Sequence, residues 1–178
     1  MAPGLIRVHG SQPGGKRNLG RIVVGVGEMG VSNRAGDRLI THSLGSCLGI
    51  AIHDPLALVG GLLHIMLPDS TLNPQMADRY PCMFANTGLC NLFNTVRDLG
   101  ARRQRLKVVL VGGARVIAGK NSFHIGERNY RAVRRILWRN NILVSAEEVG
   151  GTAARTMDLN MADGEVTVLI NAERTKKL

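Results

Sequence analysis

Residues 41–70 read THSLGSCLGIAIHDPLALVGGLLHIMLPDS, and this stretch decides the fold. Two apolar runs, residues 48–53 and 59–66, flank a short segment that begins with Asp54 and Pro55. This pattern predicts a β-hairpin. Cys47 lies in a glycine-bracketed turn before the first run, and His64 lies within the second. Such a turn can expose a side chain together with backbone amides, as a nucleophile and an oxyanion site require.

The register of this hairpin decides whether the cysteine and the histidine can meet. If Asp54 and Ala57 flank a two-residue turn, Cys47 lies directly opposite His64. Directly opposed side chains have Cβ atoms about 4.5–5.5 Å apart, which suits a dyad in which the histidine takes the thiol proton. A one-residue slip would turn the two side chains to opposite faces, so the dyad is a hypothesis about register.

The other histidines fit such a dyad less well. His53 lies further along the same strand as Cys47, at a distance of about 20 Å when each residue rises about 3.3 Å. His42 lies across the turn with no fixed direction, and His124 precedes a helix and could approach only through the tertiary fold. The alternative for Cys47 is the usual role of a free cysteine, a small apolar side chain in the core.

Two further features bear on a Cys–His site. Thr41, at the end of the preceding strand, is a candidate to orient the histidine ring through its hydroxyl, although a threonine in a strand is also simply a good β-former. Backbone amides near Ser46 and Cys47 would hold an oxyanion. We therefore take Gly45, Ser46 and Gly113 as candidate substrate-binding residues, the last because it follows another strand end.

The remaining pattern predicts an α/β fold, a layered domain with mixed β-sheets and two main helices. Helices are expected at residues 83–99 and 127–140, where apolar residues recur at steps of three and four. Strands are expected at residues 22–26, 106–111, 142–144, 155–159 and 165–170, and a further strand is expected to begin at residues 39–41 and to break at Gly45. Residues 71–82 are expected to form a polar connection, and Asp163-Gly164 is a turn signal.

Length and composition restrict the class of protein. The chain of 178 residues predicts one domain over residues 21–178, preceded by a flexible basic extension over residues 1–20. The net charge of +10 favours an acidic partner, while only 3% aromatic residues argue against stacking on single-stranded nucleic acid. Three cysteines without a Cys-x-x-Cys pair, and no signal peptide or membrane helix, predict a cytoplasmic protein in a reducing compartment.

Several short motifs, taken together, resemble the CheD family of chemoreceptor glutamine deamidases. They occur in family order and span about residues 22–170. The motifs are VGVGEM (24–29), TxxLGSCLG (41–49), DP (54–55), HIMLPDS (64–70), GGA (112–114), IGERN (125–129) and GGxxAR (150–155), where x marks a position that does not count toward the resemblance. By contrast, the dinucleotide-type pattern Gly25-x-Gly27-x-x-Gly30 is discounted, because no helical periodicity follows it.

The resemblance implies a catalytic cysteine at Cys47, a histidine at His64 and a threonine at Thr41, with no metal or cofactor. It implies a fold similar to that of toxin deamidases with a Cys–His site. The implied reaction converts glutamines of methyl-accepting chemotaxis receptors to glutamate with release of ammonia. The implied partners are the cytoplasmic helical bundle of the receptor, whose acidic methylation region would suit a basic surface, and for some members a CheC-type phosphatase.

Two other functions fit parts of the sequence. A non-catalytic module that docks on receptors or on a phosphatase would use Cys47 only for packing. A nucleic-acid-binding protein would use the positive charge, and its affinity would fall steeply with salt. The presence of Thr41, Cys47 and His64 together favours the deamidase over both.

Overall fold

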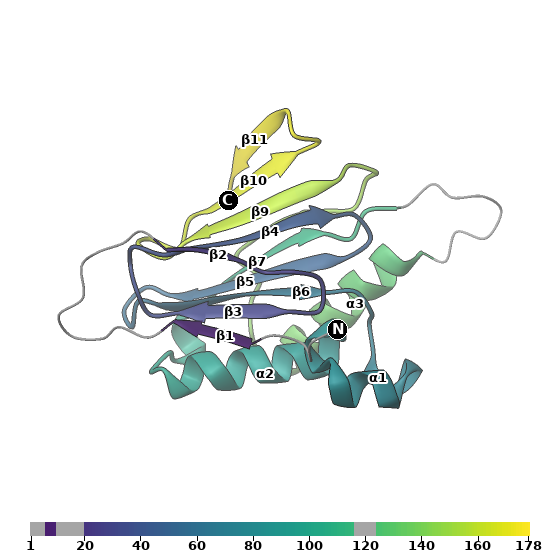
Figure 1. Ribbon diagram of the computed structural model, residues 1–178, viewed down its shortest axis with the longest axis horizontal. Helices are drawn as coiled ribbons and strands as arrows, with labels where there is room; N and C mark the ends of the chain where they lie inside the picture. Colours follow the sequence, from purple (N-terminus) through teal and green to yellow (C-terminus); the bar gives the residue numbers. More distant parts are fainter. Residues whose placement is uncertain (1–5, 10–19, 116–123) are drawn as a thin grey trace.

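The computed structural model describes residues 6–9, 20–115 and 124–178, and arranges them in three layers (Figure 1). The middle layer is a six-stranded sheet in the order β1 (Ile6–His9), β3 (Met29–Ser32), β6 (Val59–Ile65), β5 (Leu48–Asp54), β7 (Lys107–Gly112) and β8 (Ala146–Val149). A five-stranded sheet covers one face, in the order β11 (Arg174–Lys177), β10 (Val166–Ile170), β9 (Arg155–Asn160), β4 (Arg38–Leu44) and β2 (Arg21–Val23). Helices α2 (Ala85–Asp98) and α3 (Ile125–Arg139) cover the other face, and a short α1 (Pro74–Arg79) precedes them.

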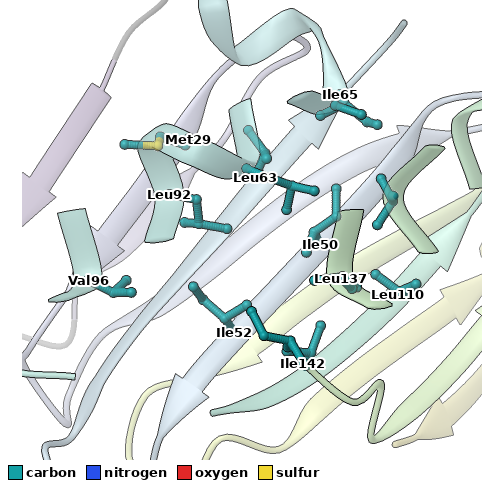
Figure 2. Close-up of a cluster of buried hydrophobic side chains, with 14 of the residues drawn as sticks. Met29, Ile50, Ile52, Leu63, Ile65, Leu92, Val96, Leu110, Leu137 and Ile142 are labelled. Atoms are coloured by element: carbon teal, nitrogen blue, oxygen red, sulfur yellow. The ribbon is translucent and has the colours of Figure 1, made fainter. Parts of the chain in front are cut away.

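The middle sheet separates two apolar cores. Every residue of β5 and β6 is buried, because helices cover one face of these strands and the second sheet covers the other. Figure 2 shows the first core, where Ile50, Ile52 and Leu63 of the strands meet Leu92 of α2 and Leu137 of α3. The alternate residues of the same strands point into the second core, between the sheets. A strand buried on both faces reads as a continuous apolar run, which makes this hairpin predictable from sequence.

The predicted fold class, α/β with mixed sheets and two main helices, is confirmed. Helices α2 and α3 lie where the periodicity places them, and strands β4, β5, β6, β7, β9 and β10 lie at or beside predicted positions. Each sheet combines parallel and antiparallel pairs: β1 and β3, β7 and β8, and β2 and β4 are parallel. No helix that the structure describes is long and apolar enough to span a membrane.

Several local predictions differ from the structure. Residues 142–144 form no strand; they lead into β8, and Ile142 packs in the first core. The predicted strand at residues 22–26 is limited to β2, and residues 24–28 form a loop. Strands β3 and β11 were not predicted, and the expected connection at residues 71–82 contains α1. Most of the expected flexible extension at residues 1–20 lies outside the described residues, but its residues 6–9 form β1 instead.

Asp54 holds the turn of the central hairpin. The loop between β5 and β6 has four residues, 55–58, rather than the two expected. The buried Asp54 carboxylate accepts hydrogen bonds from the amides of Leu56 at 3.0 Å and Ala57 at 3.1 Å. It also accepts from the amide of Arg102 at 2.8 Å and from the guanidinium of Arg105 at 2.6 Å. Burial alone would raise the pKa of Asp54, but the bonds from Arg105 and from the three amides outweigh it and lower the pKa to about 2.

Candidate active site

Strands from different sheets bring the candidate threonine and histidine together. Thr41 lies on β4 in the five-stranded sheet, and His64 lies on β6 in the six-stranded sheet. Both side chains are fully buried. Thr41 Oγ1 lies 2.7 Å from His64 Nδ1, which is the contact that an orienting role for Thr41 requires.

The hydrogen-bond pattern fixes the tautomer of His64. Thr41 Oγ1 also lies 2.7 Å from the carbonyl oxygen of Val24. A carbonyl can only accept, so the single hydroxyl hydrogen of Thr41 goes to Val24, and Oγ1 accepts from Nδ1–H of His64. The free electron pair of the neutral ring is therefore on Nε2. Among the described residues this Nε2 has no hydrogen-bond partner, so it is available to act as a base.

Burial sets the protonation state of both candidate catalytic groups. It lowers the pKa of His64 to about 4, so the imidazole is neutral at pH 7. Burial also raises the pKa of the Cys47 thiol, although the cysteine's own backbone amide lowers it slightly. Both shifts favour the uncharged thiol and imidazole over a thiolate–imidazolium pair.

A β-bulge carries the chain from Thr41 to the cysteine turn. Between Thr41 and Leu44, β4 advances by three residues while its partner β9 advances by two. Ser43 lies in this interval with a φ of 59°. Leu44 is buried in the second core, and residues 45–47 form a half-buried turn. The predicted break of this strand at Gly45 is thus confirmed.

The predicted pairing of Cys47 with His64 is wrong by two residues. His64 lies directly opposite Gly49, because the hairpin turn is two residues longer than expected. A shift of two keeps the same face of the strand, so Cys47 lies diagonally from His64 on the side facing the five-stranded sheet. Gly49 shows which side this is: a Cβ there would lie 2.9 Å from Leu44 Cδ1 and 3.0 Å from Met157 Sδ. The second sheet therefore leaves no space for a side chain opposite His64.

The carbonyl groups of the cysteine turn, residues 45–47, accept hydrogen bonds from other segments of the chain. The carbonyl of Gly45 accepts from the amide of Ala114 at 2.7 Å, and that of Cys47 accepts from the amide of Gly113 at 2.8 Å. The carbonyl of Ser46 accepts a third bond, from a side chain of α3. Gly113 is a predicted substrate-binding residue, but its amide already donates a hydrogen bond to the carbonyl of Cys47. In this structure Gly113 therefore holds the cysteine turn in place.

The opposite side of this turn carries the available amides. In the part of the chain that the structure describes, the amides of Ser46 and Cys47 donate to no other residue. A Cβ at Gly45 would meet no heavy atom of the described residues within 4 Å, so the turn is not packed against them at this position. Gly45 and Ser46 thus lie beside Cys47 in the same half-buried turn, and their role in substrate binding stays a prediction.

Sequence reasoning missed two features next to the candidate residues. The first is the loop at residues 24–28: the amide of Gly27 donates to the carbonyl of His64 at 2.9 Å, and the amide of His64 donates to that of Glu28 at 3.1 Å. The second is Asn129, a buried side chain of α3. Both lie in motifs that carry the family resemblance, but local pattern gives neither a role, because their partners are distant in sequence.

His42, His53 and His124 have surroundings different from those of His64. His42 is exposed, and its Nδ1 lies 3.3 Å from Thr156 Oγ1. His53 is buried against the carbonyl of Met161 at 3.3 Å. His124 is exposed at the start of α3. Within residues 6–9, 20–115 and 124–178, no group of three or more His, Cys, Asp or Glu side chains could hold a metal ion.

Comparison with known proteins identifies the family of this chain. Residues 66–169 match the CheD family, described as CheD chemotactic sensory transduction. The chain is 42% identical over 150 residues to the probable chemoreceptor glutamine deamidase CheD 1 of Syntrophus aciditrophicus, covering 84% of this chain and 94% of that protein. It is 43% identical over 154 residues to the probable chemoreceptor glutamine deamidase CheD of Solibacter usitatus, covering 86% and 91%.

Among solved structures, the hypothetical protein YfiH of Bacillus licheniformis aligns with a TM-score of 0.43 at 10% identity, over 70% of this chain and 49% of that one. The two CheD relatives are far more similar to this chain in sequence, and the alignments span nearly the whole length of each relative. The chain therefore belongs to the CheD family of chemotactic sensory transduction.

Proposed function

We propose that the protein is a glutamine deamidase that acts on chemoreceptors, with Cys47 as nucleophile, His64 as general base and acid, and Thr41 as the residue that orients the histidine. The observation that carries the proposal is the buried hydrogen bond between Thr41 Oγ1 and His64 Nδ1. It leaves Nε2 as the free base, on the face of β6 that Cys47 shares. The names of the relatives support the same substrate and reaction.

The reaction follows from the chemistry of these groups. As the sulfur of Cys47 attacks the carboxamide carbon of a glutamine, His64 Nε2 takes the thiol proton. The amides of Ser46 and Cys47 donate hydrogen bonds to the oxyanion that forms. When the C–N bond breaks, His64 returns the proton to the departing ammonia and leaves a thioester. His64 then takes a proton from water as the water attacks, and the C–S bond breaks to give glutamate and the free thiol.

The proposed substrate region is the cytoplasmic helical bundle of a methyl-accepting chemotaxis receptor, so the proposed place of action is the cytoplasm. A glutamate formed there could then be methylated, which links the reaction to adaptation in chemotaxis. The family resemblance also supports a CheC-type phosphatase as a partner, and this interaction is part of the same proposal.

The test is mass spectrometry of a receptor cytoplasmic fragment after incubation with the protein. The wild type is expected to convert particular glutamines to glutamate with release of ammonia, and Cys47→Ala is expected to convert none. Cys90→Ala is the matched control, because Cys90 is an exposed cysteine on α2 and should be dispensable. A folded wild type that binds the fragment without converting it would favour a docking module. Conversion that survives Cys47→Ala would exclude Cys47 as the nucleophile.

A further inference from the structure

The side chain of Asn129 links the cysteine turn to the strand of the histidine. Asn129 lies on α3 and is fully buried. Its Nδ2 lies 3.0 Å from the carbonyl oxygen of Ser46 and 2.9 Å from that of Met66. Both partners can only accept, so the amide nitrogen, which has two hydrogens, must face them. Among the described residues the other atom, Oδ1, has no hydrogen-bond partner, so the donors are what the site uses.

The hydrogen bond from Asn129 to the carbonyl of Ser46 also sets the direction of the amide of Cys47, which belongs to the same peptide group. A trans peptide is planar, and its C=O and N–H point in opposite directions. No cis peptide occurs among the described residues. Fixing the carbonyl of Ser46 toward Asn129 therefore directs the amide of Cys47 away from α3, to the side where that amide has no donor contact with another described residue.

The first turn of α3 packs closely against the residues that follow β7, and this packing brings Asn129 close to Ser46. A Cβ at Gly126 would lie 2.5 Å from the carbonyl oxygens of both Gly113 and Ala114, so only glycine allows the first turn of α3 to approach these residues. Gly113 and Ala114 in turn donate to the carbonyls on either side of Ser46. All three carbonyls of the cysteine turn thus accept hydrogen bonds from two segments that pack against each other, residues 113–114 and α3.

We infer that Asn129 is a positioning residue for the oxyanion site: it holds the Ser46–Cys47 peptide so that the amide of Cys47 can stabilise the tetrahedral intermediate. This inference rests on the proposed function for its meaning, since an oxyanion forms only in acyl transfer. It concerns the transition state rather than substrate binding. Loss of Asn129 should therefore lower kcat and leave KM nearly unchanged.

Two reagents separate this role from a general effect on the fold. Acylation of Cys47 by p-nitrophenyl acetate passes through a tetrahedral oxyanion, whereas alkylation by iodoacetamide does not. In Asn129→Asp, the side chain keeps its size but can donate at most one hydrogen bond to the two carbonyls, and only while it is protonated. We expect its acylation rate to fall about 100-fold, the usual cost of losing an oxyanion donor, while its alkylation rate stays within about threefold of wild type. If Asn129→Asp does not fold, the acylation and alkylation rates of Asn129→Ala are compared with those of the wild type instead.

Leu137→Ala is the matched control. Leu137 is buried on the same helix, and its truncation lowers thermal stability without touching the cysteine turn. Its ratio of acylation to alkylation should equal that of the wild type. The inference is overturned if Asn129→Asp and Asn129→Ala keep the wild-type ratio, or if their ratio changes only as much as in Leu137→Ala. A wild type that is acylated but does not deamidate receptors would contradict the proposed function and leave this comparison valid.

Discussion

At the scale of single residues, Thr41 is the clearest test of the proposed chemistry. Thr41→Val keeps the shape of the side chain but removes the acceptor for Nδ1–H of His64. The ring can then carry its proton on Nε2, which disables the base, so kcat should fall about 100-fold. Thr41→Ser should retain most activity. Thr156→Val is the control, because Thr156 forms the exposed threonine–histidine contact with His42. Equal kcat values for Thr41→Val and wild type would contradict the orienting role.

The buried imidazole also predicts how stability depends on pH. The pKa of His64 is about 4 in the folded protein and about 6.5 in an unfolded chain. Below pH 6.5 the unfolded chain binds a proton that the folded protein refuses, so the free energy of unfolding falls as the pH falls. The slope is about 1.4 kcal/mol per pH unit between pH 6.5 and 4. Urea unfolding of wild type and His64→Gln at pH 7 and 4.5 checks this: only the wild type should lose this contribution.

At the scale of elements, the carboxylate of Asp54 is expected to stabilise the hairpin and the loop before β7. Asp54→Ala leaves Arg105 and three amides without their acceptor, which should cost about 3 kcal/mol in urea unfolding. The contribution should be full above pH 4 and disappear as the pH falls toward 2, because the folded pKa lies below the unfolded one. Asp98→Ala, which removes the exposed pair with Arg97, should matter far less.

The same hairpin shows what could and could not be predicted from the sequence. Its two strands are predictable because burial on both faces makes them continuous apolar runs. Its register is not, since turn length depends on the bonds of Asp54 to residues far along the chain. Residues 142–144 look like a strand because they are apolar. The real strand, β8, is at the sheet edge and contains two glutamates, as edge strands often carry charge.

In the candidate site, too, some features could be predicted from the sequence and others could not. Cys47 and His64 could be predicted as a pair because they lie on one hairpin, and an error of two residues in register keeps them on one face. The contact of Thr41 with His64 joins two sheets, so its place in the sequence made Thr41 only a candidate, and the family resemblance was needed to give it a role. Asn129 escaped prediction because its partners, Ser46 and Met66, are more than sixty residues away in the sequence.

At the scale of the whole molecule, the net charge of +10 should affect encounter with an acidic receptor region more than chemistry. Arg135 and Arg139 are exposed on α3, the helix whose first turn borders the cysteine turn. Raising the salt concentration should raise KM for the receptor fragment and leave kcat unchanged, because salt screens exposed charges. Replacing both arginines with glutamate should raise KM mainly at low salt. A KM that is independent of salt would contradict electrostatic recruitment.

The burial of Cys47 has a consequence for its survival in the presence of peroxide. Oxidation to sulfenic acid proceeds through the thiolate, and burial raises the pKa of Cys47, so little thiolate exists at rest. Cys82 is fully buried, and burial raises its pKa to about 11. Cys90 is exposed on α2, outside the candidate site. An oxidant should therefore react with Cys90 first, and the burial that raises the pKa of Cys47 should also keep this proposed nucleophile reduced.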